Sequence, residues 1–282
     1  ASASDWKYFN SPEDGARVTK GWFKVVAPDE DNDNVFSNTY GHTTFATTDA
    51  GDETERWYYA DGDGQLAEGV IKKIKGKYYG FRPESDGEGK GAAMLTGLVL
   101  MKTQGEKIID VLDDSVDADE LDDILDGTTS IPSGYTLFYF GSDEDTDGAM
   151  KTGNTTVSVS GDSYNFLFSK TGGAEGKGRG MTGIDDKYIY MYGCRIKADS
   201  DDKYQVVQVT STSGAKDTSA SGVTVAKVKS SDLRALSSSA SFVNDDDDSV
   251  SVKKLARSNY YLVNTSGAIQ KSKVAAKDGD DW

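Results

Sequence analysis

The most regular pattern along the chain is a run of alternating aromatic residues followed by a polar turn. In runs such as Tyr-x-Tyr and Phe-Tyr-Phe, alternation places the aromatic rings on one face of a β-strand. A segment rich in Gly and Asp follows, and these residues tolerate the positive φ angles of tight turns. A Met or Leu then leads back toward the aromatic run, often before Thr-Gly. Each such unit is predicted to form an antiparallel β-hairpin.

Five copies of this unit can be traced along the sequence. Their ranges are 57–69, 78–97, 138–153, 164–183 and, as a degenerate copy, 259–273. A lone two-stranded hairpin is marginally stable in water, so successive hairpins must pack against one another. The fold class expected is therefore mainly β, with successive antiparallel β-hairpins stacked as a solenoid-like array and interrupted by short helical insertions.

Two stretches depart from the hairpin pattern and are predicted to contain helix. From Ile108 to Leu125, apolar residues recur near helical spacing among many Asp residues, which predicts a short acidic amphipathic helix. The helical pattern is strongest from Ser115 to Leu125. Ser231 is a suitable N-cap for another helical turn over residues 230–236.

The repeats become less regular after about residue 205, which predicts two domains. Residues 1–205 are expected to form the aromatic hairpin region, with the acidic helical insertion near 108–126. Residues 206–282 are expected to form a less regular C-terminal β part that includes the degenerate hairpin. Within it, 223–228 alternates like a strand, whereas the flanking Ser- and Asp-rich segments are predicted loops.

Composition and charge limit the classes of partner. The chain of 282 residues carries 47 acidic and 31 basic side chains, a net charge of −16. This field repels phosphate backbones and anionic lipid headgroups, so we expect no nucleic acid partner. No segment approaches the roughly 18 to 20 apolar residues of a membrane span, so no membrane insertion is expected. Cys194 is the only cysteine, which excludes an intrachain disulfide.

The repeats resemble the cell-wall-binding repeats of the choline-binding and glucan-binding family, which also occur in the repeat regions of clostridial toxins. A unit of that family combines Gly-Trp, a short turn, Trp-Tyr-Tyr, a turn containing Gly, and Met-x-Thr-Gly. The matching segments here are Gly21-Trp22, Trp57-Tyr58-Tyr59, Met94 to Gly97, Met150 to Gly153 and Met181 to Gly183. The resemblance implies a non-catalytic, extracellular or cell-surface protein of the Gram-positive type, which binds a cell-wall polymer or other polysaccharide.

The resemblance also implies an aromatic ligand site. In the family, aromatic residues of neighbouring units surround a quaternary ammonium or support a sugar ring. The corresponding residues here are Trp22, Trp57 and Tyr59, with Tyr78 or Tyr79 of the next unit as a further wall. Only Trp22 fills the family's Trp position after Gly, since Val70, Leu98, Asn154 and Ile184 stand there in the other units. One site is therefore expected, and burial of these aromatics in the hairpin core is the alternative.

Acidic and glycine-rich segments suggest other sites. Asp143, Asp145 and Asp147, followed by Gly148, have the alternation that opens a calcium-binding loop. The twelfth position is Asn154 in place of a bidentate Glu, so a solvated hairpin turn is the alternative, and no other cofactor is expected. Asp29, Asp31 and Asp33 form a similar but weaker run that lacks the Gly. Asp245 to Asp248 has no alternation and is expected to be a solvated acidic loop.

The remaining candidate chemistry is sparse. The Gly-rich stretch from Gly172 to Gly180 lacks the ending of a phosphate-binding loop, so a flexible hairpin tip is expected there. His42 is the only histidine, which excludes a multi-histidine metal centre. No pair of carboxylates stands out as a catalytic pair, so no enzymatic activity is expected.

Three functions stay open on the sequence. The first is a binding protein whose ligand is choline, a glucan or another glycan. The second is a structural spacer or adhesin with a host or surface protein as its partner. The third and weakest is a polysaccharide hydrolase.

Overall fold

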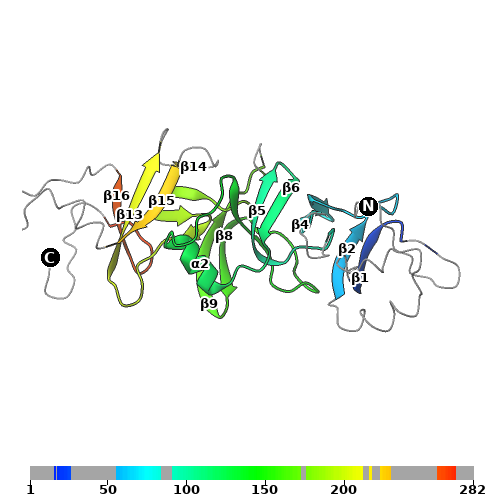
Figure 1. Cartoon of the computed structure of the whole chain (residues 1–282), viewed down its shortest axis with the longest axis horizontal. Helices are drawn as coiled ribbons and strands as arrows, with labels where there is room; N and C mark the ends of the chain where they lie inside the picture. The colour runs from blue at the N-terminus through cyan, green and yellow to red at the C-terminus, as the bar shows by residue number, and fades with distance from the viewer. Residues whose placement is uncertain are drawn as a thin grey trace, which may run out of the picture. The chain divides into compact units, whose positions relative to one another are not determined.

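The computed structural model confirms the mainly β fold of successive antiparallel hairpins. It describes residue 16 and residues 18–26, 55–83, 91–172, 176–211, 216–217, 223–229 and 259–270. His42, Asp29 to Asp33, Asp245 to Asp248 and the helical turn predicted at 230–236 lie outside the described residues. The chain divides into two compact units, and Figure 1 labels many of their elements.

Unit 1 comprises Ala1–Val116, Gly134–Thr152 and Lys170–Gly178. Its described strands are β1 (Gly21–Val26), β2 (Glu55–Ala60), β3 (Val70–Ile74), β4 (Lys77–Phe81), β5 (Gly97–Gln104), β6 (Lys107–Asp113) and β7 (Tyr135–Phe140). Strands β1 and β2 pair with each other, and the other strands form a sheet of order β4-β3-β6-β5-β7. All of these pairings are antiparallel.

Unit 2 comprises Asp117–Ser133, Gly153–Ser169 and Arg179–Trp282. Its described elements are α2 (Ala118–Leu125), β8 (Gly153–Val159), β9 (Asp162–Phe168), β10 (Thr182–Asp185), β11 (Tyr188–Met191), β12 (Cys194–Arg195), β13 (Tyr204–Ser211), β14 (Lys216–Asp217), β15 (Val223–Val228) and β16 (Tyr260–Asn264). One sheet has the order β14-β10-β11-β12-β9-β8, and another has the order β15-β13-β16. The strand predicted at 223–228 is β15. The domain boundary predicted near residue 205 stays a prediction.

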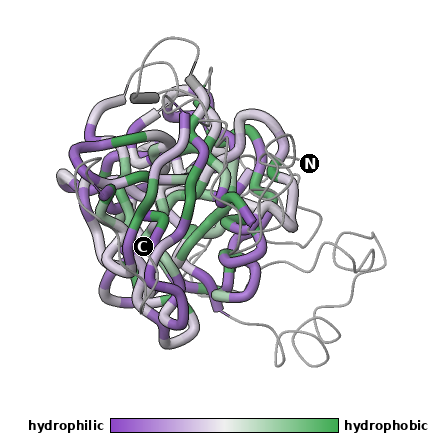
Figure 2. The backbone as a smooth tube through the Cα atoms, turned by 90° about the vertical axis from the view of Figure 1, so that its left-hand side faces the viewer, coloured by the Kyte–Doolittle hydropathy of each residue, from purple (hydrophilic) through white to green (hydrophobic). Residues whose placement is uncertain are grey.

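The five predicted hairpins share one way of closing. The last residue of each aromatic run forms an isolated bridge with the residue that returns from the turn. These bridges are Ala60↔Leu66, Phe81↔Met94, Phe140↔Met150, Phe168↔Gly180 and Val263↔Ile269. In Figure 2, hydrophobic residues concentrate along the strands and hydrophilic residues at the turns between them. The local sequence of each unit therefore produces the same local structure.

Successive hairpins of unit 1 are joined by backbone hydrogen bonds at their Met residues. The Met94 N–H donates to the Trp57 carbonyl at 2.8 Å, and the Met150 N–H donates to the Tyr78 carbonyl at 2.8 Å. Close packing accompanies this bonding, because a Cβ on Gly80 would lie 2.6 Å from the Phe140 ring. Phe140 belongs to a buried core cluster that also contains Ile71, Leu95, Val99, Met101, Ile108, Phe138 and Met150.

The acidic helix forms over a shorter range than the sequence predicts. Helix α2 begins after the N-cap Asp117, whose side chain accepts a hydrogen bond from the Glu120 N–H while Glu120 bonds the Asp117 N–H in return. Its buried residues are Ala118, Leu121, Ile124 and Leu125. Figure 1 shows the helix beside β8 and β9, and the Ala118 N–H lies 3.4 Å from Ser160 Oγ in the turn between those strands.

The prediction of helix from Ile108 onward is wrong, because residues 107–113 form strand β6. The pairing of β6 with β5 shifts register twice, leaving Ile109 and Leu112 as extra residues in β6. Each bulge lets residues three apart share a face of the sheet, which imitates helical spacing. Ile108 is buried, whereas the bulged Ile109 and Leu112 are 37% and 49% exposed.

No helix among the described residues is long and apolar enough to cross a membrane. The degenerate hairpin predicted at 259–273 is present over its described part, where β16 precedes the turn to Ala268 and Ile269.

Candidate aromatic site

Strands β1 and β2 place four of their side chains on one face of their two-stranded sheet. The register pairs Trp22 with Tyr59 and Lys24 with Trp57. Residues two apart on one strand, and residues opposite each other on paired strands, share a face. Trp22, Lys24, Trp57 and Tyr59 therefore project from the same side, while Phe23 stacks on Tyr58 on the other side with ring centroids 5.7 Å apart.

Trp22 lies at the centre of a cluster of aromatic rings. Its ring centroid is 5.3 Å from that of Tyr59, 4.9 Å from that of Tyr79 and 5.6 Å from that of Phe81. The Trp57 centroid is 6.4 Å away, with the two indole planes nearly perpendicular. The pairs with Tyr59, Tyr79 and Trp57 are edge-to-face, an arrangement that is favourable for aromatic quadrupoles. Trp22 is half-buried, so it both stabilises the core and presents part of its ring to solvent.

A small cavity opens beside these rings. Its volume is about 230 Å³, and it is lined by Trp22, Trp57, Tyr79, Met94, Glu144, Asp145, Thr146 and Gly148. The lining residues come from β1, β2, β4 and the turns that follow β4 and β7. The cavity therefore exists only where three successive hairpin segments meet.

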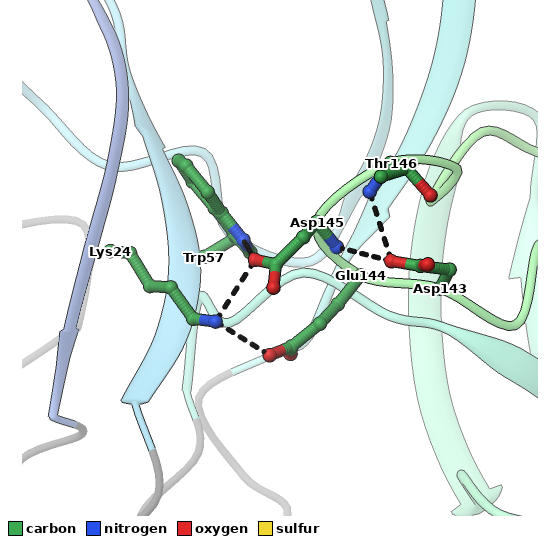
Figure 3. A network of polar contacts seen from close by, with 6 residues as sticks. All are labelled: Lys24, Trp57, Asp143, Glu144, Asp145 and Thr146. Atoms are coloured by element: carbon green, nitrogen blue, oxygen red, sulfur yellow. Dashed lines mark hydrogen bonds and ion pairs between the residues drawn. The ribbon is translucent and has the colours of Figure 1, made fainter.

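An acidic turn that carries Glu144 and Asp145 lines one side of the cavity. Figure 3 shows the polar contacts of this turn with Lys24 and Trp57. Lys24 Nζ lies 2.9 Å from a carboxylate oxygen of Glu144 and 2.9 Å from one of Asp145. The same Asp145 oxygen accepts a hydrogen bond of 2.8 Å from the Trp57 indole N–H. Lys24 Nζ also lies 6.0 Å from the Trp57 ring centroid. These contacts fix the turn against β1 and β2.

The contacts of the acidic turn shift the pKa values of Asp145 and Lys24. Hydrogen bonds from Lys24 and then from Trp57 lower the pKa of Asp145 below its ordinary value. Hydrogen bonds to Glu144 and then to Asp145 raise the pKa of Lys24. All three contacts favour the ionised forms. The turn thus presents two acidic side chains, Glu144 and Asp145, to the single basic side chain of Lys24.

The structure brings together some of the predicted site residues and separates others. Trp22, Trp57 and Tyr79 line the cavity. Tyr59 lies in the core cluster beneath them and is 8% exposed. Tyr78 packs against another core cluster, which includes Ile71 and Leu95, because adjacent residues of a strand face opposite ways. Tyr79, and not Tyr78, supplies the wall from the next hairpin.

Five lining residues were not predicted as part of this site, namely Met94, Glu144, Asp145, Thr146 and Gly148. Met94 belongs to the Met-x-Thr-Gly segment that marks the hairpins, so its position in the repeat was visible although its role was not. Glu144 and Asp145 lie in a later turn of the chain. Asp145 is 88 residues from Trp57 in the sequence. Nothing local in the sequence connects that turn to the aromatic rings.

The structure does not bring Asp143, Asp145 and Asp147 together as a calcium-binding loop would. Asp143 accepts hydrogen bonds from the backbone N–H groups of Asp145 and Thr146, both at 3.0 Å. The Thr146 side chain and then its backbone N–H lower the pKa of Asp143. Asp147 pairs with Lys151 at 2.5 Å, and Asp145 faces Lys24. In the described part of the chain, no three His, Cys, Asp or Glu side chains are grouped to hold a metal ion.

Comparisons with known proteins give only distant similarity. Neither a protein-family model nor a curated protein sequence matches the chain. Among solved structures, CbpJ from Streptococcus pneumoniae TIGR4 aligns with a TM-score of 0.30 and 14% identity, over 94% of this chain and 70% of that one. CbpF in complex with ipratropium aligns with a TM-score of 0.32 and 16% identity, over 94% and 76%. Choline binding protein F from Streptococcus pneumoniae with a peptidoglycan analogue aligns with a TM-score of 0.24 and 16% identity, over 94% and 75%.

Proposed function

We propose that the chain is a non-catalytic, secreted or cell-surface protein that binds a quaternary ammonium group, such as that of choline, carried on a cell-wall polymer. The observation that carries this proposal is the cavity in which Trp22, Trp57 and Tyr79 stand opposite two carboxylates. Aromatic faces carry a negative quadrupole and attract a cation. A quaternary ammonium has no hydrogen to donate, so an aromatic site accepts it without leaving a donor unpaired.

The size of the cavity supports a small ligand group. Its volume of about 230 Å³ lies below the roughly 300 to 1,000 Å³ of pockets that bury drug-sized ligands. A trimethylammonium headgroup fits such a space, whereas a run of several sugar residues does not. The rest of a polymer would stay outside the cavity.

The charge of the site favours a cation over an anion or a neutral sugar. Glu144 and Asp145 contribute two negative charges, and Lys24 compensates only one of them. The chain as a whole adds a net charge of −16, which raises the local concentration of cations. A neutral sugar would gain ring stacking alone, while a quaternary ammonium gains stacking and charge attraction.

The electrostatics of the same site support a binding role without catalysis. Glycoside hydrolysis needs a carboxylic acid whose pKa is raised, so that it can protonate the leaving group near neutral pH. Asp145 has the opposite property, because Lys24 and Trp57 lower its pKa. It stays ionised at neutral pH, and we infer that it attracts charge and does not donate a proton.

The decisive experiment compares a small cation with a neutral sugar. Tetramethylammonium chloride and a glucose oligomer are titrated separately into the folded chain, and binding is followed by Trp fluorescence and by NMR of the Tyr rings. We expect saturable binding of the cation with a Kd of about 1 mM, as expected for a few exposed cation–π contacts of about 1 kcal/mol each plus one net charge. The glucose oligomer should bind far more weakly.

Two variants show whether binding uses this cavity. Trp22→Ala removes a wall and should abolish cation binding. Phe23→Ala removes an aromatic ring from the same strand, on the opposite face, and should leave binding intact. Preference for the sugar would replace the proposal with glycan binding. A folded chain that binds neither ligand, and is not retained on cell walls, choline resin or insoluble glucan, would favour the spacer or adhesin function.

A further inference from the structure

The hydrogen bonds between hairpins define equivalent positions in successive repeats. Met94 donates its N–H to the carbonyl of Trp57, and Met150 donates its N–H to the carbonyl of Tyr78. Trp57 and Tyr78 therefore occupy the same position in neighbouring hairpins. The ring of Tyr78 stands at the second junction of unit 1, where the ring of Trp57 stands at the first junction.

Glycines in the following turns show the same equivalence. A Cβ on Gly148 would lie 2.5 Å from the Met94 methyl carbon, and a Cβ on Gly178 would lie 2.3 Å from the Met150 sulfur. The turn before Met150 thus packs on Met94 as the turn at Gly178 packs on Met150. Each junction combines one aromatic ring, one Met and one turn from a later hairpin.

The two junctions differ in the charge that the turn supplies. At the first junction the turn carries Glu144 and Asp145 into the cavity lining. At the second junction the turn carries Lys177, whose Nζ lies 4.6 Å from the centroid of the Tyr78 ring. Both junctions also carry a lysine on the strand opposite the ring, since Lys24 Nζ lies 6.0 Å from the Trp57 centroid and Lys73 Nζ lies 5.6 Å from that of Tyr78. Lys177 is an additional and closer cation that the turn supplies at the second junction, well within the roughly 6 Å range of cation–π attraction.

The backbone around Lys177 holds it in this place. Gly176 and Gly178 have φ angles of +88° and +87°, which L side chains rarely adopt. A Cβ on Gly176 would lie 2.4 Å from the Gly105 carbonyl oxygen, so the turn approaches the hairpin of β5 and β6 closely. A cavity of about 320 Å³ beside Tyr78 is lined by Ile71, Tyr78, Gly105, Glu106, Gly172, Gly176 and Lys177.

We propose that Lys177 is a built-in cation that occupies the aromatic face of Tyr78 and closes a second, latent site for a small quaternary ammonium ion. The inference rests on the proposed function of the first junction for its choice of ligand. An ammonium attached to the same chain has an effective concentration of millimolar or more. A free ligand that binds an aromatic site with millimolar affinity therefore does not displace the Lys177 ammonium from the Tyr78 ring. In unit 1, Lys24 leaves the first junction open because its Nζ stays 6.0 Å from the Trp57 centroid, whereas Lys177 fills the second junction at 4.6 Å from the Tyr78 centroid.

Unit 2 repeats the arrangement of an internal cation on an aromatic ring. The Ile269 N–H donates to the Lys187 carbonyl at 2.8 Å, so Lys187 stands at the position of Trp57 and Tyr78, and the aromatic ring here belongs to the next residue, Tyr188. The guanidinium carbon of Arg195 lies 3.8 Å from the Tyr188 ring centroid. A Cβ on Gly267 would lie 2.8 Å from the Arg195 side chain, which here takes the place of a Met against the turn.

The test uses the full chain with ring-labelled Tyr and tetramethylammonium chloride as the probe. In the wild type, the probe should shift the NMR signals of Tyr79 and leave Tyr78 unchanged. In Lys177→Ala, the NMR signals of Tyr78 should also shift. The Kd for the probe at Tyr78 should lie within about tenfold of the Kd at Tyr79, since a tenfold difference corresponds to the free energy of about one cation–π contact. Lys170→Ala removes the same charge from the same turn and should behave as the wild type. Without any ligand, the Lys177 ε-methylene protons of the wild type should be shifted upfield by the Tyr78 ring.

The outcomes separate this inference from the proposed function. A response of Tyr78 in the wild type, or its silence in a folded Lys177→Ala chain, would overturn the latent site. If Lys177→Ala does not fold, Lys177→Gln removes the charge while keeping most of the side chain, and the same readout applies. Silence of Tyr79 in the wild type would overturn the proposed function. A response of Tyr78 in Lys177→Ala would still support the latent site in that case.

Discussion

Asp145 accepts a hydrogen bond from the indole N–H of Trp57 at 2.8 Å, although 88 residues separate them in the sequence. The bond connects an acidic turn to an aromatic strand and places a carboxylate beside the rings that line the cavity. Asp145 also holds Lys24, so a single carboxylate orients one wall of the cavity and its charge.

Replacing Asp145 by Asn should weaken cation binding while preserving the site's shape. The amide oxygen can still accept the Trp57 hydrogen bond, but the negative charge is lost. Loss of one partly exposed charge costs about 1 kcal/mol, close to a fivefold increase in the Kd of tetramethylammonium. Asp147→Asn removes the same charge from the same turn without altering the cavity lining, so its Kd should match the wild type. Equal Kd values for all three chains would show that the charge of Asp145 has no role.

Cation binding should depend on pH in the acidic range only. The pKa of Asp145 is lowered by Lys24 and Trp57, so its carboxylate is charged at every pH well above the ordinary value of 3.8. We therefore expect a constant Kd from pH 8 to about 5, and weaker binding as the pH falls below about 4. Fluorescence titration at each pH gives the Kd, and near-ultraviolet circular dichroism verifies the fold. A loss of affinity centred near pH 6 would point to a different group.

Substitution of Gly80 by Ala should destabilise the stacked hairpins. The new methyl group would lie 2.6 Å from the Phe140 ring and 3.1 Å from a Leu95 methyl group. Overpacking of this kind costs about 1 to 3 kcal/mol in the free energy of unfolding, measured by urea denaturation. Gly62→Ala places a methyl group where no atom lies within 4 Å and should change stability little. Adding Phe140→Leu to Gly80→Ala should recover part of the loss relative to Phe140→Leu alone.

The thiol of Cys194 should be unreactive in the folded protein. Burial is the main cause that raises its pKa to about 12, so the thiolate needed for reaction is scarce at pH 8. An aromatic disulfide reagent should modify it only after unfolding, with a rate that follows the denaturant concentration. Because the folded pKa exceeds the unfolded one, the associated stability is complete below the ordinary value of 9.0 and declines as the pH rises toward 12. Cys194→Ala should show a smaller loss of stability over that range.

The hairpins were predictable because each carries its own signals. Alternating rings, a turn of Gly and Asp, and a returning apolar residue lie within about 20 residues of one another, as in the hairpin closed by Phe140 and Met150. Helix α2 was predictable for the same reason, since its cap and its buried face are local. Strand β6 was not, because the bulges at Ile109 and Leu112 gave it a helical spacing that only pairing with β5 explains.

The aromatic site was predictable only in part. Trp22 and Trp57 follow from the resemblance of the repeats, but the choice between Tyr78 and Tyr79 depends on which face of β4 meets β1 and β2. Glu144 and Asp145 reach the site through the stacking of a later hairpin, and no pattern within their own segment indicates this. Residues that meet through stacking are therefore the ones that sequence patterns miss.

The origin of the cavity walls in distant segments also sets the time at which the site can form. Lys24 and Asp145 are 121 residues apart. At a synthesis rate of about 5 to 20 residues per second, the ribosome adds Asp145 roughly 6 to 24 seconds after Lys24. A nascent chain thus carries the Trp22 ring before the turn that completes its surroundings, and the cavity is complete only when the third hairpin has emerged and folded onto the second.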